Sequence, residues 1–322
     1  MFTETELEDA ARLVYTQMPA TAQFAWPLLA QETGIELWVK HENHTPIGAF
    51  KVRGGITFID WVRRTQPNSR GICTATRGNH GQSQARAAIA AGMSAKVFVP
   101  EGNSVEKNAA MRAFGAELIV HGSDFDEARE EAFRVADADG LTVVPPYHTE
   151  LVRGVATYGW ELLTTVPDLD TIYVPIGCGS GICGVIAARD ALGSNAEVVG
   201  VVSDAADGAL QSMRAGHLVE TNSARTFADG MAVRIPVQAA FDVYSSGAAR
   251  IVSVSDDDVA EAIRLYYRTT HNIAEGAGAA PLAAAMQEKD ALAGRKVAVI
   301  LCGGNIDAGL FQQVISGTTP SV

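Results

Sequence analysis

Residues 45–55 read TPIGAFKVRGG, and this glycine-flanked segment holds the most informative lysine of the chain. The sequence has six lysines, and only Lys51 lies between bulky apolar neighbours, Phe50 and Val52, in what the glycines indicate is a turn. An amine partly removed from water in such a turn is a better nucleophile toward an aldehyde. A lysine that lies along a loop with its ammonium in solvent is the simpler explanation, so this segment needs support from elsewhere in the chain.

A glycine-rich turn follows the apolar run at residues 171–176 and precedes a helical pattern that begins at residue 182. The turn consists of Gly177, Cys178, Gly179, Ser180 and Gly181. Backbone N–H groups in such a turn converge on one point, and the positive end of the following helix favours an anion there. No Lys-Ser/Thr pair follows and the GxGxxG fingerprint is incomplete, so a monophosphate fits better than a nucleotide. Glycine chosen only for a tight turn is the competing interpretation.

Two other segments begin where predicted strands end. Residues 74–82 read TATRGNHGQ and lead from a strand into a helix. The hydroxyl of Thr76 and the amides near Asn79 suit a carboxylate, although an ordinary helix start with a solvated His80 would have the same sequence. Residues 302–305 read CGGN and follow an apolar strand, where a buried cysteine before a turn is the competing interpretation.

Apolar β-rich runs alternate with helical patterns through most of the chain, which predicts an α/β fold with parallel-rich sheets covered by helices on both faces. The predicted strands are residues 71–76, 95–100, 116–121, 141–144, 171–176, 197–202 and 296–301. The predicted helices are residues 80–91, 105–114, 124–138, 154–166, 182–192, 256–270 and 305–315. Residues 71–147 contain four strand–helix alternations and are predicted to form a small domain, with residues 1–70 and 148–322 forming the larger one. Ligands of such sheets bind beyond the carboxyl ends of the strands, where the four segments fall.

Composition narrows the function further. A formal net charge of -12 disfavours binding to nucleic acid or anionic membranes, so a small molecule is the expected partner. The four cysteines lack CxxC spacing and histidine partners, which predicts neither disulfides nor a structural metal. The start, MFTETELEDA, does not read as a signal peptide, and no apolar run reaches the ~20 residues that span a bilayer. We therefore expect a cytoplasmic protein.

Taken together, the four segments resemble the fold-type-II pyridoxal phosphate enzymes, which share a two-domain, tryptophan synthase β-like fold. Within these, the chain is most similar to the serine/threonine dehydratase and serine racemase group, from about Pro19 to Asp307. The resemblance implies pyridoxal 5′-phosphate as cofactor, an amino-acid substrate and a homodimer. It also implies that the larger domain binds the cofactor and that residues 71–147 form a mobile domain.

The resemblance assigns roles to individual residues. Lys51 would bind the cofactor covalently and move the substrate α-proton, with Phe50 packed along the cofactor. Asn79 would hydrogen-bond the pyridine 3-oxygen, Glu275 would lie near the ring, and Cys302 would face the pyridine nitrogen. The turn at residues 177–181 would bind the phosphate. The substrate α-carboxylate would be bound by Thr76 together with the backbone at Asn79 and His80.

A thiol at position 302 favours elimination over transamination. A carboxylate facing the pyridine nitrogen would keep it protonated, whereas Cys302 is a weak donor that leaves the ring largely neutral. Loss of the α-proton is then best accompanied by loss of a β-hydroxyl, and the released product hydrolyses to a keto acid and ammonia. The resemblance therefore predicts an ammonia-lyase acting on a β-hydroxy-α-amino acid.

Several positions depart from the group. Ala49 replaces a common serine, and residues 153–157 read RGVAT where the group commonly has AGQGT. Arg77 stands where racemases have a second catalytic serine, so racemisation is disfavoured. The group's divalent-cation positions correspond to Val202 and Gly208, and no metal is predicted even though Asp204 and Asp207 are nearby.

The guanidinium of Arg77 suggests the substrate. Assisted by Arg153, it would bind a second carboxylate in a bidentate manner, which favours 3-hydroxyaspartate over serine or threonine. Alternatively, Arg77 turns away to pair with an acidic residue or with the cofactor phosphate. Other functions remain open: an amino-acid racemase, β-replacement as in cysteine synthase, or a non-catalytic cofactor-binding regulatory module. The presence of Lys51 together with Asn79 argues against the last.

Overall fold

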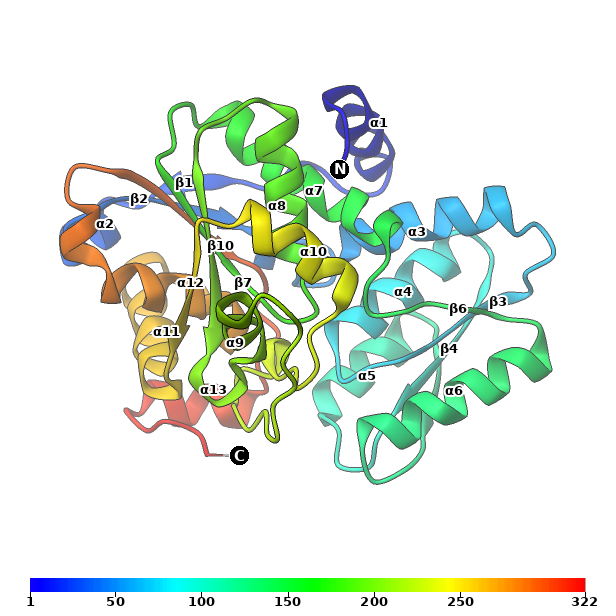
Figure 1. Cartoon of the computed structure of the whole chain (residues 1–322). Helices are drawn as coiled ribbons and strands as arrows, with labels where there is room; N and C mark the ends of the chain where they lie inside the picture. Colours follow the sequence, from blue (N-terminus) through cyan, green and yellow to red (C-terminus); the bar gives the residue numbers. More distant parts are fainter. Residues whose placement is uncertain (322) are drawn as a thin grey trace.

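Ten strands form two separate sheets in the computed structural model, which describes residues 1–321 (Figure 1). The larger sheet has the strand order β1-β2-β10-β7-β8-β9, and only the β1–β2 pair is antiparallel. Its strands are β1 (Gln23–Ala25), β2 (Glu36–His41), β7 (Thr171–Pro175), β8 (Glu197–Ser203), β9 (Arg250–Val254) and β10 (Lys296–Leu301). The central strand β7 is buried along its whole length, as expected for a parallel strand covered on both faces.

Helices cover both faces of the larger sheet. α12 packs on β7, β8 and β10 with α11 behind it, whereas α8 packs on β7 and β8 beside α7, and Figure 1 shows the two pairs on opposite sides of the sheet. The helices of this part, the larger lobe, are α1 (Glu4–Tyr15), α2 (Pro27–Thr33), α3 (Lys51–Thr65), α7 (Thr149–Thr165), α8 (Ser180–Ala191), α9 (Gly208–Ala215), α10 (Gln238–Gly247), α11 (Asp256–Thr270), α12 (Gly276–Gln287) and α13 (Ala308–Ile315).

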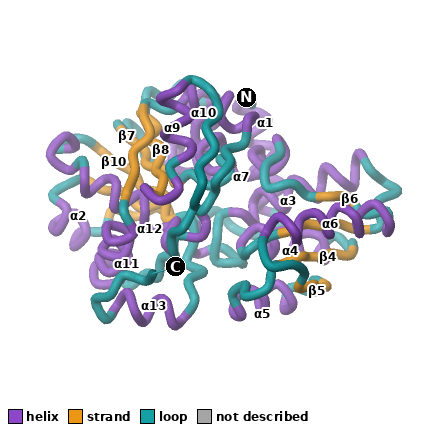
Figure 2. Tube along the Cα trace, turned by 60° about the horizontal axis from the view of Figure 1, so that its bottom comes forward, coloured by secondary structure: helices purple, strands orange, loops and turns teal. Residues whose placement is uncertain are grey.

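The second sheet is entirely parallel and has the order β5-β4-β3-β6. Its strands are β3 (Gly71–Ala75), β4 (Ser94–Val99), β5 (Glu117–Val120) and β6 (Thr142–Val143), with helices α4 (Asn79–Ala90), α5 (Val105–Ala113) and α6 (Phe125–Asp139). This smaller lobe lies beside the larger one in both views (Figures 1 and 2). Its four strands fall within residues 71–147, the predicted small domain, and its mobility remains a prediction.

The predicted fold class is confirmed, and each of the seven predicted strands matches an observed strand to within one residue at either end. Three strands were missed, β1, β2 and β9, together with helices α1, α2, α3, α9, α10 and α12. Helix α12 was not predicted because its sequence, GAGAAPLAAAMQ, is apolar on every side. The helix is almost completely buried, so it shows no amphipathic pattern.

The prediction that Lys51 lies in a turn is wrong, because Lys51 is the first residue of helix α3. The glycines that suggested a turn instead let neighbouring helices approach α3. A Cβ on Gly54 would lie 2.8 Å from the backbone oxygen of Leu151 in α7, and one on Gly55 would lie 2.3 Å from Oγ of Ser83 in α4. α3 therefore packs against helices of both lobes.

None of the helices formed by residues 1–321 is long and apolar enough to cross a membrane.

Candidate active site

Two loops joined by backbone hydrogen bonds hold Lys51 beside Cys302. The Phe50 amide donates to the Cys302 oxygen at 2.9 Å, and the Gly304 amide donates to the Gly48 oxygen at 2.9 Å. Gly48 has a φ of 69°, and a Cβ there would lie 2.6 Å from Oδ1 of Asn305, so both its conformation and its surroundings require glycine. The carboxyl end of β10 and the start of α3 are thus brought together.

Lys51 lies among the other predicted site residues. Its Nζ is 4.6 Å from the centroid of the Phe50 ring, and that ring meets Tyr158 edge-to-face at a centroid distance of 6.0 Å. Burial lowers the pKa of His80 and the nearby Lys51 charge lowers it further, whereas the pKa of Glu275 is raised by burial and Lys51 only partly opposes this. Residues widely separated in the sequence therefore surround one amine.

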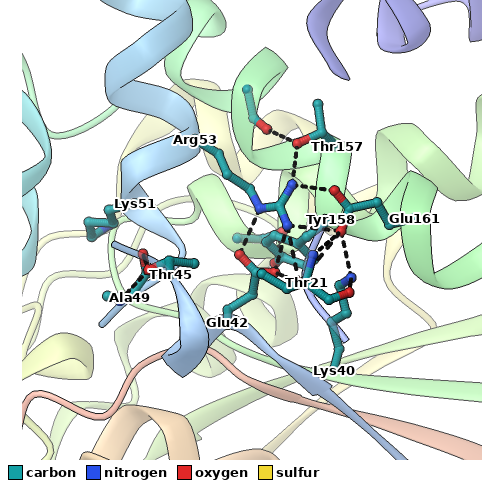
Figure 3. Close-up of polar contacts among 12 residues, drawn as sticks. Thr21, Lys40, Glu42, Thr45, Ala49, Lys51, Arg53, Thr157, Tyr158 and Glu161 are labelled. Atoms are coloured by element: carbon teal, nitrogen blue, oxygen red, sulfur yellow. Dashed lines mark hydrogen bonds and ion pairs between the residues drawn. The ribbon is translucent and has the colours of Figure 1, made fainter. Parts of the chain in front are cut away.

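A buried network of charges supports the first turn of α3 from the side opposite Lys51 (Figure 3). Arg53 is fully buried; its Nε donates to Glu42 at 2.7 Å and its Nη1 donates to Glu161 at 2.6 Å. Lys40 donates to the same Glu161 carboxylate at 2.6 Å. Burial opposes ionisation of Glu161, but Arg53 and Lys40 hold the pKa of its carboxyl below the usual value. Two cations and two anions balance, and they tie α3 to β2 and α7.

The glycine-rich turn forms a cradle at the N-terminus of α8. Gly179 adopts a φ of 95°, and a Cβ there would lie 2.5 Å from that of Ala240. A Cβ on Gly177 would lie 2.2 Å from the Gly230 oxygen. The N-cap residue of α8, Gly179, makes no side-chain cap hydrogen bond, so the first N–H groups of this helix are available to an anion. The turn at residues 177–181 therefore fits a phosphate group.

Asn79 is held at the start of α4 by two partners from the larger lobe. Its Nδ2 donates to both carboxylate oxygens of Glu275, at 2.8 and 3.0 Å, and its Oδ1 accepts from Asn305 at 2.8 Å. Burial raises the pKa of Glu275 to about 7, although Lys107 acts in the opposite direction. The side-chain amide assigned to the pyridine 3-oxygen is thus oriented by Glu275 and Asn305.

Cys302 has the properties of a neutral thiol. The residue is 4% exposed, and burial, followed by the nearby Glu275 carboxylate, raises the pKa of the thiol well above its usual value. Burial also raises the pKa of Cys178 in the glycine-rich turn. Both sulfurs are therefore weak donors instead of thiolates.

The residues predicted to bind the substrate carboxylate lie at the start of α4. Thr76 is buried, and its Oγ1 accepts from the amides of Gly78 and Gly81 at 3.1 and 3.3 Å. His80 is not solvated: its Nε2 is buried and has no hydrogen-bond partner among residues 1–321. Burial, together with the Lys51 charge, lowers the pKa of His80 to about 3, so the imidazole is neutral.

The two arginines predicted to act together have different surroundings. Arg77 is exposed, and no acidic side chain within residues 1–321 forms an ion pair with it. The Nε of Arg153 instead donates to Glu150, one turn earlier in α7, at 2.8 Å. Arg153 therefore already has an acidic partner, and its role as an assistant of Arg77 stays a prediction.

Sequence reasoning missed several residues around the site, notably Lys107, Asp229 and Tyr158. Lys107 and Asp229 form an ion pair although 122 positions separate them, and no local pattern indicates such a pairing. Tyr158 donates to the Gly181 oxygen at 3.1 Å and so links α7 to the glycine-rich turn. Within residues 1–321, no group of His, Cys, Asp or Glu side chains is arranged to hold a metal ion.

Comparison with known proteins defines the class. The family model for pyridoxal-phosphate dependent enzymes matches residues 16–303, and the chain belongs to this family. It is 32% identical to an L-threonine ammonia-lyase of Thermotoga maritima, over 98% of this chain and 79% of that protein. It is 29% identical to the L-threo-3-hydroxyaspartate ammonia-lyase of Saccharomyces cerevisiae, over 96% of this chain and 95% of that protein.

A solved structure agrees with these relatives. The processed form of threonine deaminase isoform 2 from Solanum lycopersicum superposes with a TM-score of 0.90 at 27% identity, covering 98% of this chain and 94% of that one. The protein is thus a fold-type-II enzyme of the serine/threonine dehydratase and serine racemase group, and its reaction is a pyridoxal phosphate-dependent β-elimination from an amino acid. The cradle at residues 177–181 and the neutral Cys302 thiol suit this cofactor.

Proposed function

We propose that this enzyme removes water, and then ammonia, from a β-hydroxy-α-amino acid, and that it favours 3-hydroxyaspartate over serine and threonine. The observation that carries the substrate preference is the unpaired guanidinium of Arg77, on the loop between Thr76 and Gly78. An exposed arginine without an acidic partner is available to a ligand carboxylate, which its planar fork matches. The similarity to the L-threo-3-hydroxyaspartate ammonia-lyase of Saccharomyces cerevisiae adds support.

In this proposal, pyridoxal phosphate supplies the electron sink that stabilises negative charge at the substrate α-carbon. Lys51 holds the cofactor and moves the α-proton from its position beside Phe50 and Cys302. The turn at residues 177–181 binds the phosphate, and Cys302 leaves the pyridine nitrogen neutral. Thr76 and the backbone amides at Asn79 and His80 bind the α-carboxylate. The enamine that leaves the site becomes an imine and hydrolyses to a keto acid and ammonia.

Alternative functions have weaker support. A racemase needs a second proton donor on the face of the substrate opposite Lys51, and Arg77 replaces the hydroxyl that would serve. A purely regulatory, non-catalytic module would not need Lys51 beside the oriented Asn79. We also propose that the enzyme is a cytoplasmic homodimer and that residues 71–147 form a mobile domain.

The substrate test compares ammonia release from 3-hydroxyaspartate stereoisomers, serine and threonine. Arg77→Ala should lower kcat/KM for 3-hydroxyaspartate by about fivefold, because an ion pair formed by an exposed arginine contributes up to about 1 kcal/mol. Serine should be affected far less. Arg63, an exposed arginine near the end of α3, provides the matched control as Arg63→Ala. A wild type that prefers threonine, with Arg77→Ala lowering all substrates alike, would contradict the proposal.

A second test concerns the lysine. Borohydride reduction of the holoenzyme should attach the cofactor to a peptide that contains Lys51, as read by mass spectrometry. Lys51→Ala should abolish elimination but leave a folded protein, because the phosphate cradle is a separate element. Labelling of another lysine would show that the site is wrongly assigned.

A further inference from the structure

Lys107 connects the two lobes next to the candidate active site. It lies in the first turn of α5 in the smaller lobe, and its Nζ forms an ion pair with Asp229 of the larger lobe. The Lys107 side chain is 8% exposed, whereas that of Asp229 is 40% exposed. Burial opposes the charged form of Lys107, but Asp229 and then Glu275 outweigh it and hold its pKa above the usual value. Lys107 therefore brings a cation to two carboxylates of the other lobe.

The carbon chain of Lys107 also contacts the substrate loop. A Cβ on Gly78 would lie 2.7 Å from Cδ of Lys107, so the lysine stem lies directly against the residue before Asn79. Asn79 is in turn bound to Glu275, the second carboxylate whose charge acts on Lys107. One side chain thus contacts the loop at residues 76–79 with its stem and the larger lobe with its charge.

Neighbouring contacts strengthen the same junction. Ser104, which caps α5, donates to Asp307 at 2.6 Å, and the Ala308 amide donates to Glu106 at 3.0 Å. The start of α5 therefore meets the start of α13. Ser104, Glu106 and Lys107 thus all contact the larger lobe.

We propose that Lys107 is a positioning residue that keeps the loop at residues 76–79 closed over Lys51, by joining that loop to Asp229 and Glu275 across the lobes. The inference rests on the proposed function, because it assigns this loop to the substrate carboxylate. A loop held closed presents its amides in one arrangement before the substrate arrives. Its loss should weaken substrate binding more than it slows the chemical step.

Three variants distinguish the contribution of the Lys107 charge from that of its carbon chain. Lys107→Met retains most of the stem and loses the charge, whereas Lys107→Ala loses both, and Asp229→Asn removes the partner without altering the contact with Gly78. Lys96→Met is the matched control, because Lys96 pairs with Glu117 and Asp139 inside the smaller lobe. Each variant is studied as the holoenzyme.

The first measurement is amide hydrogen exchange without substrate. Lys107→Met and Asp229→Asn should accelerate exchange about tenfold in peptides covering residues 76–81 and 104–110, while Lys96→Met leaves both unchanged. Exchanging the charges, as Lys107→Asp with Asp229→Lys, should restore part of the protection that either single change removes. Uniform acceleration over the whole chain, or no change at residues 76–81, would overturn the proposal.

The second measurement is steady-state kinetics on whichever β-hydroxy amino acid the wild type converts. KM should rise about tenfold in Lys107→Met, while kcat changes by less than about threefold; Lys107→Ala should show a larger rise in KM. A fall in kcat at constant KM would overturn the positioning role. If no β-hydroxy amino acid is converted, the proposed function fails, whereas the hydrogen-exchange result still decides the role of Lys107.

Discussion

Two clusters of charges border the candidate site, and they differ in burial and in what they connect. The network of Lys40, Glu42, Arg53 and Glu161 lies inside the larger lobe, and none of its members is more than 4% exposed. The pair of Lys107 and Asp229 joins the two lobes, and its carboxylate is 40% exposed. The first cluster therefore suits a permanent support for α3, whereas the second suits a contact that opens and closes.

The two clusters differ in this way because breaking them costs different amounts of free energy. Removal of one partner from a buried ion pair leaves an uncompensated charge away from water and costs about 3–5 kcal/mol. The Lys107–Asp229 pair should cost less to break, because its carboxylate is 40% exposed and water can replace part of the lost contact. A site that must admit a substrate and stay ordered can thus combine a rigid side with a side that moves at small cost.

The largest expected effect is on the buried network. Arg53→Met should lower the free energy of unfolding by about 3–5 kcal/mol, because Glu42 and Glu161 would lose their shared guanidinium. Arg53→Lys should lower it less, since the ammonium keeps the positive charge but cannot make all of the guanidinium's hydrogen bonds. Urea denaturation followed by circular dichroism measures both. A loss below about 1 kcal/mol in Arg53→Met would show that this network is not the rigid support we infer.

A smaller effect concerns the pH dependence of stability through Glu275. Its folded-state pKa of about 7 lies above the ordinary value of 4.5, so the native state retains a proton that the unfolded chain has lost between these values. The contribution of Glu275 to stability is therefore present at low pH and is lost as pH rises from about 4.5 to about 7. Glu275→Gln should remove this component, as seen in unfolding free energies measured across that range. An unchanged slope would mean that Glu275 does not carry the extra proton.

The smallest effect distinguishes the two clusters by salt. Raising the ionic strength from about 0.05 M to about 0.5 M should accelerate hydrogen exchange at residues 76–81, because salt can screen the exposed carboxylate of the Lys107–Asp229 pair. The peptide around Arg53 should keep its protection, since salt does not reach a buried network. Equal acceleration at both places would remove the distinction between a fixed and an opening side.

Local patterns were enough for much of the fold. Parallel strands such as β7 and β10 are short apolar runs bounded by glycine or polar residues, and the sequence pattern alone predicts them. β2, with the sequence ELWVKH, was missed because Lys40 and His41 look like solvent-facing residues, yet both are fully buried. Lys40 is tolerated there only because Glu161, far along the chain, supplies its partner.

The sequence by itself determined the class of enzyme and predicted the residues nearest the chemistry, because Lys51, the turn at residues 177–181 and Cys302 belong to short motifs in a fixed order along the chain. Only the tertiary structure decided what holds them in place. Asn79 meets Glu275 across 196 positions, and Lys107 meets Asp229 across 122. Contacts of this kind depend on how two sheets are joined in space, and no local sequence pattern around Lys107 or Asp229 indicates its partner. Motif chemistry is local, whereas the balance of buried charge is a property of the whole fold.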